Sequence, residues 1–248
     1  MICLDISNSM LAQDVAPSRL DFAKRTIAKL LEEMPSDKVG LIVFAGSAFV
    51  QLPITTDLST AQEFLAEASP EMLSDQGTAI GEAIALARQS FSDRKDLGKA
   101  IIILTDGEDF EGNTLEVTQE ATKAGIRIDV VGIGTSSGAP IPTAEGQLTD
   151  ESGNMVVTKV NQDMCRQIAD AGKGIFVSSQ SPASAVKAIR KQLDELPRAS
   201  VNSKLENGNI ENFEPWLRAA LFLLLLEFFI MGRKNKFLIR HNIFGHEK

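Results

Sequence analysis

The feature that most constrains the fold is an alternation between short apolar runs and longer segments with helical periodicity. The longer segments place apolar residues at three- and four-residue spacing, as Leu20, Ala23 and Ile27 do, which predicts amphipathic helices. The runs are mainly apolar throughout, which is typical of strands buried on both faces of a parallel sheet; they lie at 1–5, 38–45, 99–104 and 127–133. We therefore expect an α/β fold: a doubly wound, mainly parallel, Rossmann-like sheet with helices on both faces.

One strand is expected to run antiparallel at an edge of this sheet. Residues 48–54 follow the run 38–45 after only Gly46 and Ser47, a connection too short for a crossover. Pro53 suits the exposed end of such a strand. The other expected elements are helices at 17–33, 58–68 with Asp57 as N-cap, 79–91, 115–124 ending at Gly125, 162–171 and 183–196, a loop at 134–142, a hairpin over 147–159 that turns at 151–154, and a strand at 174–177.

The chain is expected to form one large domain followed by a membrane anchor. Residues 1–197 make up the α/β domain, and 198–212 form a polar linker with few core-forming side chains. Residues 213–232 are strongly apolar and reach the roughly 20 residues that span a bilayer, so we expect a transmembrane helix there. An interfacial or core helix is the alternative, because charged residues fall inside the segment. The basic tail 233–248 predicts a cytoplasmic C-terminus and an extracytoplasmic domain.

The acidic charge and the placement of histidine exclude several functions. The formal net charge is −8, which makes nucleic acid a poor partner because its phosphates would be repelled. Both histidines, His241 and His246, lie in the tail, so the domain cannot use Ser-His-Asp or Cys-His catalysis or an imidazole metal site. Cys3 and Cys165 show no metal-ligand spacing and are interpreted as core thiols, with a disulfide between them as the alternative.

Three polar turns carry hard oxygen ligands. One follows the first strand, one precedes a helix and one follows the strand 99–104; their candidate ligands are Asp5, Ser7, Ser9, Thr78 and Asp106. Ligands of doubly wound sheets bind at the carboxyl ends of the strands, near the point where the strand order reverses, so we expect these turns to meet. Two carboxylates and three hydroxyls suit Mg²⁺ or Mn²⁺. Taken alone, the first turn also fits an ordinary strand-to-helix cap.

A cation held by this set would suit protein binding better than catalysis. Two carboxylates nearly balance a dication and hydroxyls donate weakly, so a coordination position would remain for a carboxylate of a partner protein. We assign no catalytic residue. The alternative is a Mg²⁺-dependent hydrolase or phosphotransferase with Asp5 as nucleophile, but haloacid-dehalogenase-like enzymes place a second Asp where this chain has Ser7. A third interpretation is a purely structural domain whose site is vestigial.

The motifs themselves resemble a known family. The pattern Asp5-x-Ser7-x-Ser9, Thr78 within Gly-Thr-Ala-Ile-Gly and Asp106 within Thr-Asp-Gly is similar to the metal-ion-dependent adhesion site of von Willebrand factor A (VWA) domains. Runs such as LDISNSMLAQDV, KVGLIVFAGSAFVQLPITTD and QGTAIGEAI resemble the bacterial aerotolerance-associated (Bat) membrane proteins. The resemblance covers about residues 1–196 and the apolar segment after them.

This resemblance implies a fold, a metal, partners and a location. It implies the VWA fold, with Mg²⁺ held by the hydroxyls and with the two aspartates binding directly or through water. It implies partners among other VWA, TPR-containing and MoxR-type AAA+ ATPase proteins, in an envelope assembly linked to stress or oxygen tolerance at the bacterial inner membrane. Relatives carry hydrophobic helices before the VWA domain, so we expect this chain to be a piece of a longer protein or to start at a misassigned methionine.

Overall fold

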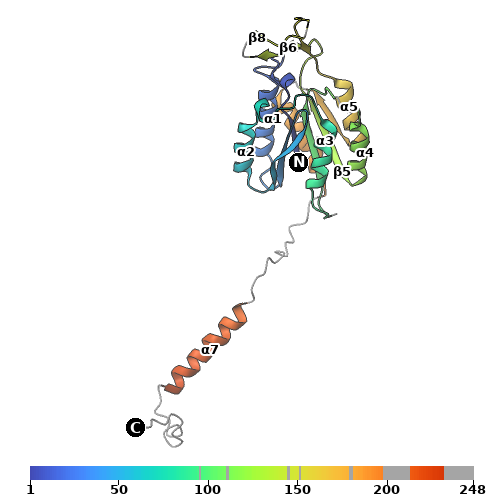
Figure 1. Ribbon diagram of the computed structural model, residues 1–248. Helices are drawn as coiled ribbons and strands as arrows, with labels where there is room; N and C mark the ends of the chain where they lie inside the picture. The colour runs from blue at the N-terminus through green and yellow to red at the C-terminus, as the bar shows by residue number, and fades with distance from the viewer. Residues whose placement is uncertain are drawn as a thin grey trace, which may run out of the picture. The chain divides into compact units, whose positions relative to one another are not determined.

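A six-stranded sheet forms the centre of the structure, and five of its strands run parallel (Figure 1). The strand order is β10-β5-β4-β1-β2-β3, and β3 pairs antiparallel with β2 at one edge, as predicted. The strands are β1 (Ile2–Asp5), β2 (Val39–Phe44), β3 (Ala48–Thr55), β4 (Lys99–Thr105), β5 (Ile126–Gly132) and β10 (Lys173–Ser178). The predicted doubly wound fold is confirmed, because the order reverses between β1 and β4.

The computed structural model describes residues 1–94, 96–109, 112–143, 146–150, 152–178, 181–197 and 213–231. The chain divides into two units, Met1–Ala199 and Ser200–Lys248. The predicted linker 198–212 and basic tail 233–248 lie outside the described residues.

Helices cover both faces of the sheet and enclose two apolar cores (Figure 1). One core is built against α1 (Arg19–Glu32), α2 (Leu58–Glu67) and α6 (Pro182–Asp194). The other is built against α3 (Ile80–Ser90), α4 (Thr114–Lys123) and α5 (Gln162–Ala171). Such two-sided burial explains why the parallel strands are apolar along most of their length.

Local signals set the ends of several helices. Ser18 accepts a hydrogen bond from the Asp21 amide at the start of α1, and Asp57 accepts one from the Thr60 amide at the start of α2, as predicted. Gly125 follows α4 with a φ of 82°, the left-handed conformation that commonly ends a helix. Two short 3₁₀ helices, η1 (Asn8–Leu11) and η2 (Pro70–Met72), were not predicted.

The region predicted as a loop at 134–142 is a loop over 134–138, as predicted, and the rest of it forms two short strands. It supplies β6 (Ala139–Pro140), which pairs with β9 (Val157–Thr158), and β7 (Pro142–Thr143), which pairs with β8 (Gly146–Gln147). Prolines in this stretch favoured a loop, but proline is tolerated in short edge strands because it lacks only the amide donor. The predicted turn is confirmed in its described part, where the Asp150 amide donates to the Asn154 carbonyl. We call the described residues of 139–158 the outer hairpin.

Both cysteines are buried and free. Burial raises the pKa of the Cys3 thiol to about 12, and that of the Cys165 thiol also to about 12. Each thiol is therefore uncharged near neutral pH and packs as a small apolar side chain. The interpretation as core thiols is confirmed, and the alternative disulfide is not formed.

The segment predicted to cross a membrane forms the helix α7 (Phe213–Met231). None of the helices in the described part of the chain combines the length and the apolarity of a membrane span. The sequence of α7 contains Glu214, Arg218 and Glu227, and a charge inside a helix weakens its insertion into a bilayer. The helical part of the prediction for 213–232 is confirmed, and its transmembrane part is not.

Substitution of Asp129 by Asn is expected to stabilise the protein at neutral pH. Asp129 on β5 is buried, its Oδ1 accepts from the Ile175 amide at 2.9 Å, and its Oδ2 has no hydrogen-bond partner among the described residues. Burial raises its pKa above the ordinary 3.8, so the native carboxylate costs stability that is recovered as the pH falls. Asp129→Asn should raise the free energy of unfolding by about 1 kcal/mol at pH 7.

Urea unfolding of both proteins at pH 7 and pH 4.5 checks this prediction. The difference in the free energy of unfolding should shrink at the lower pH, because the native carboxyl is then closer to neutral. A variant that is less stable than the native protein at pH 7 would contradict it.

Candidate metal centre

The predicted ligands lie where the strand order of the sheet reverses. Asp5 is the last residue of β1, and Ser7 and Ser9 follow it in the turn that leads into η1. Asp106 follows the last residue of β4, which is the parallel neighbour of β1. Parallel neighbours end at the same edge of a sheet, so residues about 100 positions apart in the chain come together.

Hydrogen bonds join the first turn to the turn after β4. The Ser7 amide donates to Asp5 Oδ1 at 2.9 Å, and the Ser7 and Ser9 hydroxyl oxygens lie 3.0 Å apart. The Ser9 hydroxyl also lies close enough to Asp106 to lower the pKa of that carboxyl group. Thr105 Oγ1 donates to the other oxygen of Asp5 at 2.6 Å. Four of the five predicted ligands therefore lie together at this edge of the sheet.

The loop that carries Thr78 is held at the same edge of the sheet by backbone hydrogen bonds. Its side chain is buried, and the amide of the next residue, Ala79, donates to the Ala45 carbonyl at the end of β2 at 2.7 Å. Gln76 Oε1 accepts from the Asn8 amide at 3.2 Å, which connects this loop to the first turn. The structure thus fixes the loop of Thr78 beside the turn that carries Ser7 and Ser9.

Glycine is required immediately after Asp106. Gly107 has a φ of 78°, and a Cβ at this position would lie 2.6 Å from Cys165 Sγ and 2.7 Å from the Asn161 carbonyl oxygen. The Asn161 amide donates to the Asp106 carbonyl at 2.7 Å. The turn after β4 is therefore held tightly against the start of α5.

Burial makes the two carboxylates costly to ionise. Burial, followed by the charge of Asp106, raises the pKa of Asp5 to about 7, although hydrogen bonds from Ser7 and Thr105 oppose the shift. Burial also raises the pKa of Asp106, against the lowering effects of the Ser9 hydroxyl and the Arg19 guanidinium. A cation bound between them would favour the ionised form of both carboxyl groups, so the electrostatics of the cluster fit a divalent ion.

The donor set also decides which metal could bind. In the described part of the chain, no group of three or more His, Cys, Asp or Glu side chains is placed to hold a metal ion. A site at this edge would therefore need the serine and threonine hydroxyls as well as the two aspartates. All of these donors are hard oxygens, which fit Mg²⁺ or Mn²⁺ and not a soft metal.

Sequence reasoning missed the most heavily bonded side chain near this cluster. Arg19 is completely buried and forms ion pairs with Asp14 at 2.8 Å and with Asp106 at 2.9 Å. Asp14 also accepts hydrogen bonds from the amide and the hydroxyl of Thr135. One signal was available: Arg19 is the first residue of α1, where the helix dipole disfavours a cation and so suggests an acidic partner.

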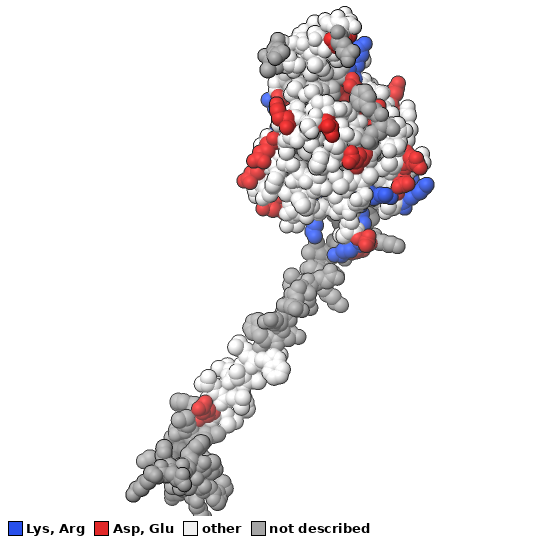
Figure 2. Space-filling view, viewed as in Figure 1, with Lys and Arg blue, Asp and Glu red and all other residues white. Residues whose placement is uncertain are grey.

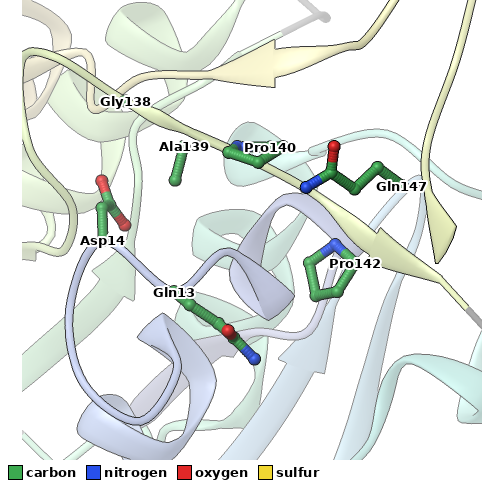
Figure 3. Close-up of a pocket in the computed structure, with 7 residues that line it drawn as sticks. All are labelled: Gln13, Asp14, Gly138, Ala139, Pro140, Pro142 and Gln147. Atoms are coloured by element: carbon green, nitrogen blue, oxygen red, sulfur yellow. The ribbon is translucent and has the colours of Figure 1, made fainter.

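A cavity of about 340 Å³ opens beside these residues (Figure 3). Gln13 and Asp14 line it from the loop after η1, and Pro140, Pro142 and Gln147 line it from the outer hairpin. Because Asp14 also binds Arg19, the cavity adjoins the side chains that contact Asp106.

Replacing Asp5 by Asn should change how the stability of the metal-free protein depends on pH. The folded-state pKa of about 7 lies above the ordinary 3.8, so the folded protein keeps a proton that the unfolded chain releases between these pH values. Native stability should therefore fall as the pH rises from about 4 to about 7. Asp5→Asn lacks this titration and should be the more stable protein at pH 7 without metal.

Thermal unfolding in EDTA at pH 5 and pH 7.5 measures this difference. Addition of Mg²⁺ at pH 7.5 should then raise the Tm of the native protein and leave that of Asp5→Asn unchanged. If the Tm of both proteins changed with pH in the same way, Asp5 would not carry the proposed proton.

Known proteins share both sequence and fold with this chain. Residues 1–108 match the von Willebrand factor type A domain family. BatB of Bacteroides thetaiotaomicron is 52% identical, with a TM-score of 0.76, and the match covers 78% of this chain and 95% of that one. An aerotolerance-related membrane protein of Bacteroides fragilis is 49% identical, with a TM-score of 0.76, over 78% of this chain and 97% of that one.

A more distant relative matches almost the whole chain. An uncharacterized protein of Borreliella burgdorferi is 28% identical over 240 residues, covering 94% of this chain and 68% of that protein. The resemblance predicted from the motifs is confirmed by the two Bacteroides structures, which are about half identical in sequence. The chain belongs to the von Willebrand factor type A domain family, together with BatB and the aerotolerance-related membrane proteins.

Proposed function

We propose that this chain binds partner proteins through a Mg²⁺-dependent adhesion site formed by Asp5, Ser7, Ser9, Thr78 and Asp106. The observation that carries the proposal is the pairing of two buried carboxylates at the carboxyl ends of β1 and β4, with the hydrogen-bonded hydroxyls of Ser7 and Ser9 beside them. When bound, Mg²⁺ would supply an electrophilic coordination position for an acidic side chain of the partner. Mn²⁺ would fit the same donors.

The surrounding residues of the chain hold these donors in place. The Ser7 amide and the Thr105 hydroxyl each occupy one oxygen of Asp5, which fixes the plane of its carboxylate. Gly107 keeps the turn after Asp106 against α5. A preorganised set of this kind loses little conformational entropy when it binds a ligand.

Charge and composition support a protein partner. Acidic side chains are spread over the face of the domain drawn in Figure 2, which disfavours nucleic acid. The domain also contains no histidine, so we propose a binding module and not an enzyme. The partner classes that the Bat resemblance implies are other VWA proteins, TPR-containing proteins and MoxR-type AAA+ ATPases, in an envelope assembly linked to stress or oxygen tolerance.

Membrane attachment through α7 is a second part of the proposal. The 49% identical protein of Bacteroides fragilis is described as a membrane protein. Six consecutive apolar side chains of α7, at 221–226, are exposed, and Arg233, Lys234, Lys236 and Arg240 follow in the sequence. We place the VWA domain on the extracytoplasmic side of the bacterial inner membrane, because basic residues favour the cytoplasmic side.

Asp5→Ala should abolish Mg²⁺ binding and Mg²⁺-dependent capture of partner proteins while the fold is retained. The substitution removes one of two charged ligands, and a metal site that loses a carboxylate loses much of its affinity. Isothermal titration with Mg²⁺ alone, followed by affinity capture with Mg²⁺ or EDTA, measures both effects. Circular dichroism checks the fold.

Asp129→Asn is the matched control, because it neutralises a buried aspartate on β5 outside the cluster. This variant should bind Mg²⁺ as the native protein does. Capture that is equal with Mg²⁺ and with EDTA would contradict the adhesion function, and hydrolysis of phosphoesters that requires Asp5 would support the enzyme alternative instead.

Leu223→Glu combined with Leu224→Glu should release the protein from membranes. Both side chains are 65% exposed on α7, and two added charges oppose burial in lipid. Val157→Glu, at an exposed apolar position of the VWA domain, serves as the control and should stay in the membrane fraction.

Fractionation of cells measures attachment, and extraction with alkaline carbonate separates a spanning helix from one bound at the surface. Native protein found in the supernatant would refute the attachment.

A further inference from the structure

Arg19 uses every donor of its guanidinium group inside the protein. Nε and Nη2 donate to the two oxygens of Asp14 at 2.8 and 2.9 Å. Nη1 donates to Asp106 Oδ2 at 2.9 Å and to Thr158 Oγ1 at 3.1 Å, and Nη2 also donates to the Thr158 carbonyl at 3.1 Å. A guanidinium has five N–H donors, so all of them are satisfied without water.

These five hydrogen bonds connect three separate parts of the chain. Asp14 belongs to the loop before α1, Asp106 to the turn that carries a proposed metal ligand, and Thr158 to the outer hairpin. The network continues on both sides, because Asp14 Oδ2 accepts from the Thr135 amide at 2.7 Å and Thr158 Oγ1 donates to Glu108 Oε1 at 2.8 Å.

The backbone at Gly134 packs directly against the guanidinium of Arg19. Gly134 has a φ of 135°, and a Cβ at this position would lie 2.9 Å from Nε and 3.0 Å from Cζ of Arg19. Any other residue would therefore push the guanidinium away from its partners. The close approach of Gly134 indicates that this part of the chain is fitted to one orientation of the arginine.

The charges of its neighbours explain how Arg19 remains protonated although it is buried away from water. Burial alone would lower its pKa, but the hydrogen bonds and charges of Asp14 and Asp106 outweigh burial and raise it, so the side chain stays charged. A buried cation with two carboxylates is stable only while the geometry of all three groups is kept. The orientation of the Asp106 carboxylate thus depends on Arg19, and that of Arg19 depends on the outer hairpin.

We propose that Arg19 is a positioning residue for Asp106 and that it couples the metal centre to the outer hairpin. This inference rests on the proposed Mg²⁺ site. Arg19 holds Oδ2 of Asp106 at 2.9 Å, while the Glu108 amide donates to Oδ1 at the longer distance of 3.3 Å, so Arg19 makes the shorter of the two contacts that orient this carboxylate. Partners that orient a metal ligand from outside the coordination shell typically change metal affinity by about 10- to 100-fold when they are removed. The outer hairpin, which borders the cavity in Figure 3, would in this way influence metal affinity without contributing a ligand.

Arg19→Lys tests the coupling because it keeps the positive charge and removes the planar fork. In metal-free protein, the Thr135 amide should lose protection from hydrogen exchange, since its acceptor Asp14 is no longer held. The Leu148 and Val156 amides, which bond to carbonyls in the same hairpin region, should keep theirs. Isothermal titration should show Mg²⁺ affinity weakened by about tenfold or more.

Arg190→Lys is the matched control. Arg190 also bridges two carboxylates, those of Asp37 and Asp194, but Asp37 precedes β2 and so lies at the opposite edge of the sheet. Mg²⁺ affinity and Thr135 protection should be unchanged in this variant. If Arg19→Lys matches this control in either measurement, the proposal is overturned.

Thr158→Val provides the test if Arg19→Lys does not fold. It removes one hydroxyl that accepts from Arg19 and donates to Glu108, while the Arg19–Asp106 ion pair is left in place. Thr135 protection should fall and Mg²⁺ affinity should weaken severalfold; native values for both would overturn the proposal. Native protein that binds no Mg²⁺ would refute the proposed function and the positioning role with it, whereas the exchange measurement separately reports whether Arg19 holds Asp14 against Thr135.

Discussion

The interaction on which the rest of the structure depends is the burial of two carboxylates at one point of the sheet. Asp5 and Asp106 are both fully buried, and buried like charges are unfavourable unless donors or cations compensate them. The strand order creates this situation, because β1 and β4 are parallel neighbours whose carboxyl ends lie side by side. The compensation comes from the Ser7 amide, the hydroxyls of Ser9 and Thr105, and the guanidinium of Arg19.

These groups do not supply enough positive charge to balance the two buried carboxylates. Arg19 contributes one positive charge, and it is shared between Asp106 and Asp14. Burial, followed by the charge of Asp106, raises the pKa of Asp5 to about 7. A divalent cation bound between the two carboxylates would favour the ionised form of both, so the electrostatics are compatible with the proposed metal site. Asp129 is also a buried carboxylate, but it belongs to no proposed site and one of its oxygens has no hydrogen-bond partner among the described residues. Its burial therefore only lowers the stability of the fold.

Sequence patterns predicted most of the fold because it is built from local signals. Apolar runs located the parallel strands, Asp57 marked a helix start, and the short connection before residue 48 identified the antiparallel edge. Asp5, Ser7, Ser9 and Asp106 were chosen as candidate ligands because they follow strand ends, which the fold class brings together, and Thr78 was chosen because its turn precedes a helix. Each of these inferences needed only spacing along the chain and a general rule of sheet topology.

Long-range pairings could not be predicted in this way. Arg19 lies 87 residues from Asp106 and 139 residues from Thr158, and no local pattern specifies those contacts. The outer hairpin was also assigned incorrectly in part, because Pro140 and Pro142 are common to loops and to edge strands. For α7, apolar composition predicted the helix, and the part of the chain that the structure describes contains no helix that meets the length and apolarity of a membrane span.

The central claim is that three separate turns converge on one divalent ion. Anomalous diffraction from crystals of the protein soaked in Mn²⁺ tests it most directly. The account predicts one strong peak at the carboxyl ends of β1 and β4, with the hydroxyl oxygens of Ser7, Ser9 and Thr78 at roughly 2.0–2.3 Å from it. An anomalous peak at another place in the protein would contradict the claim, as would a Thr78 hydroxyl directed away from those of Ser7 and Ser9.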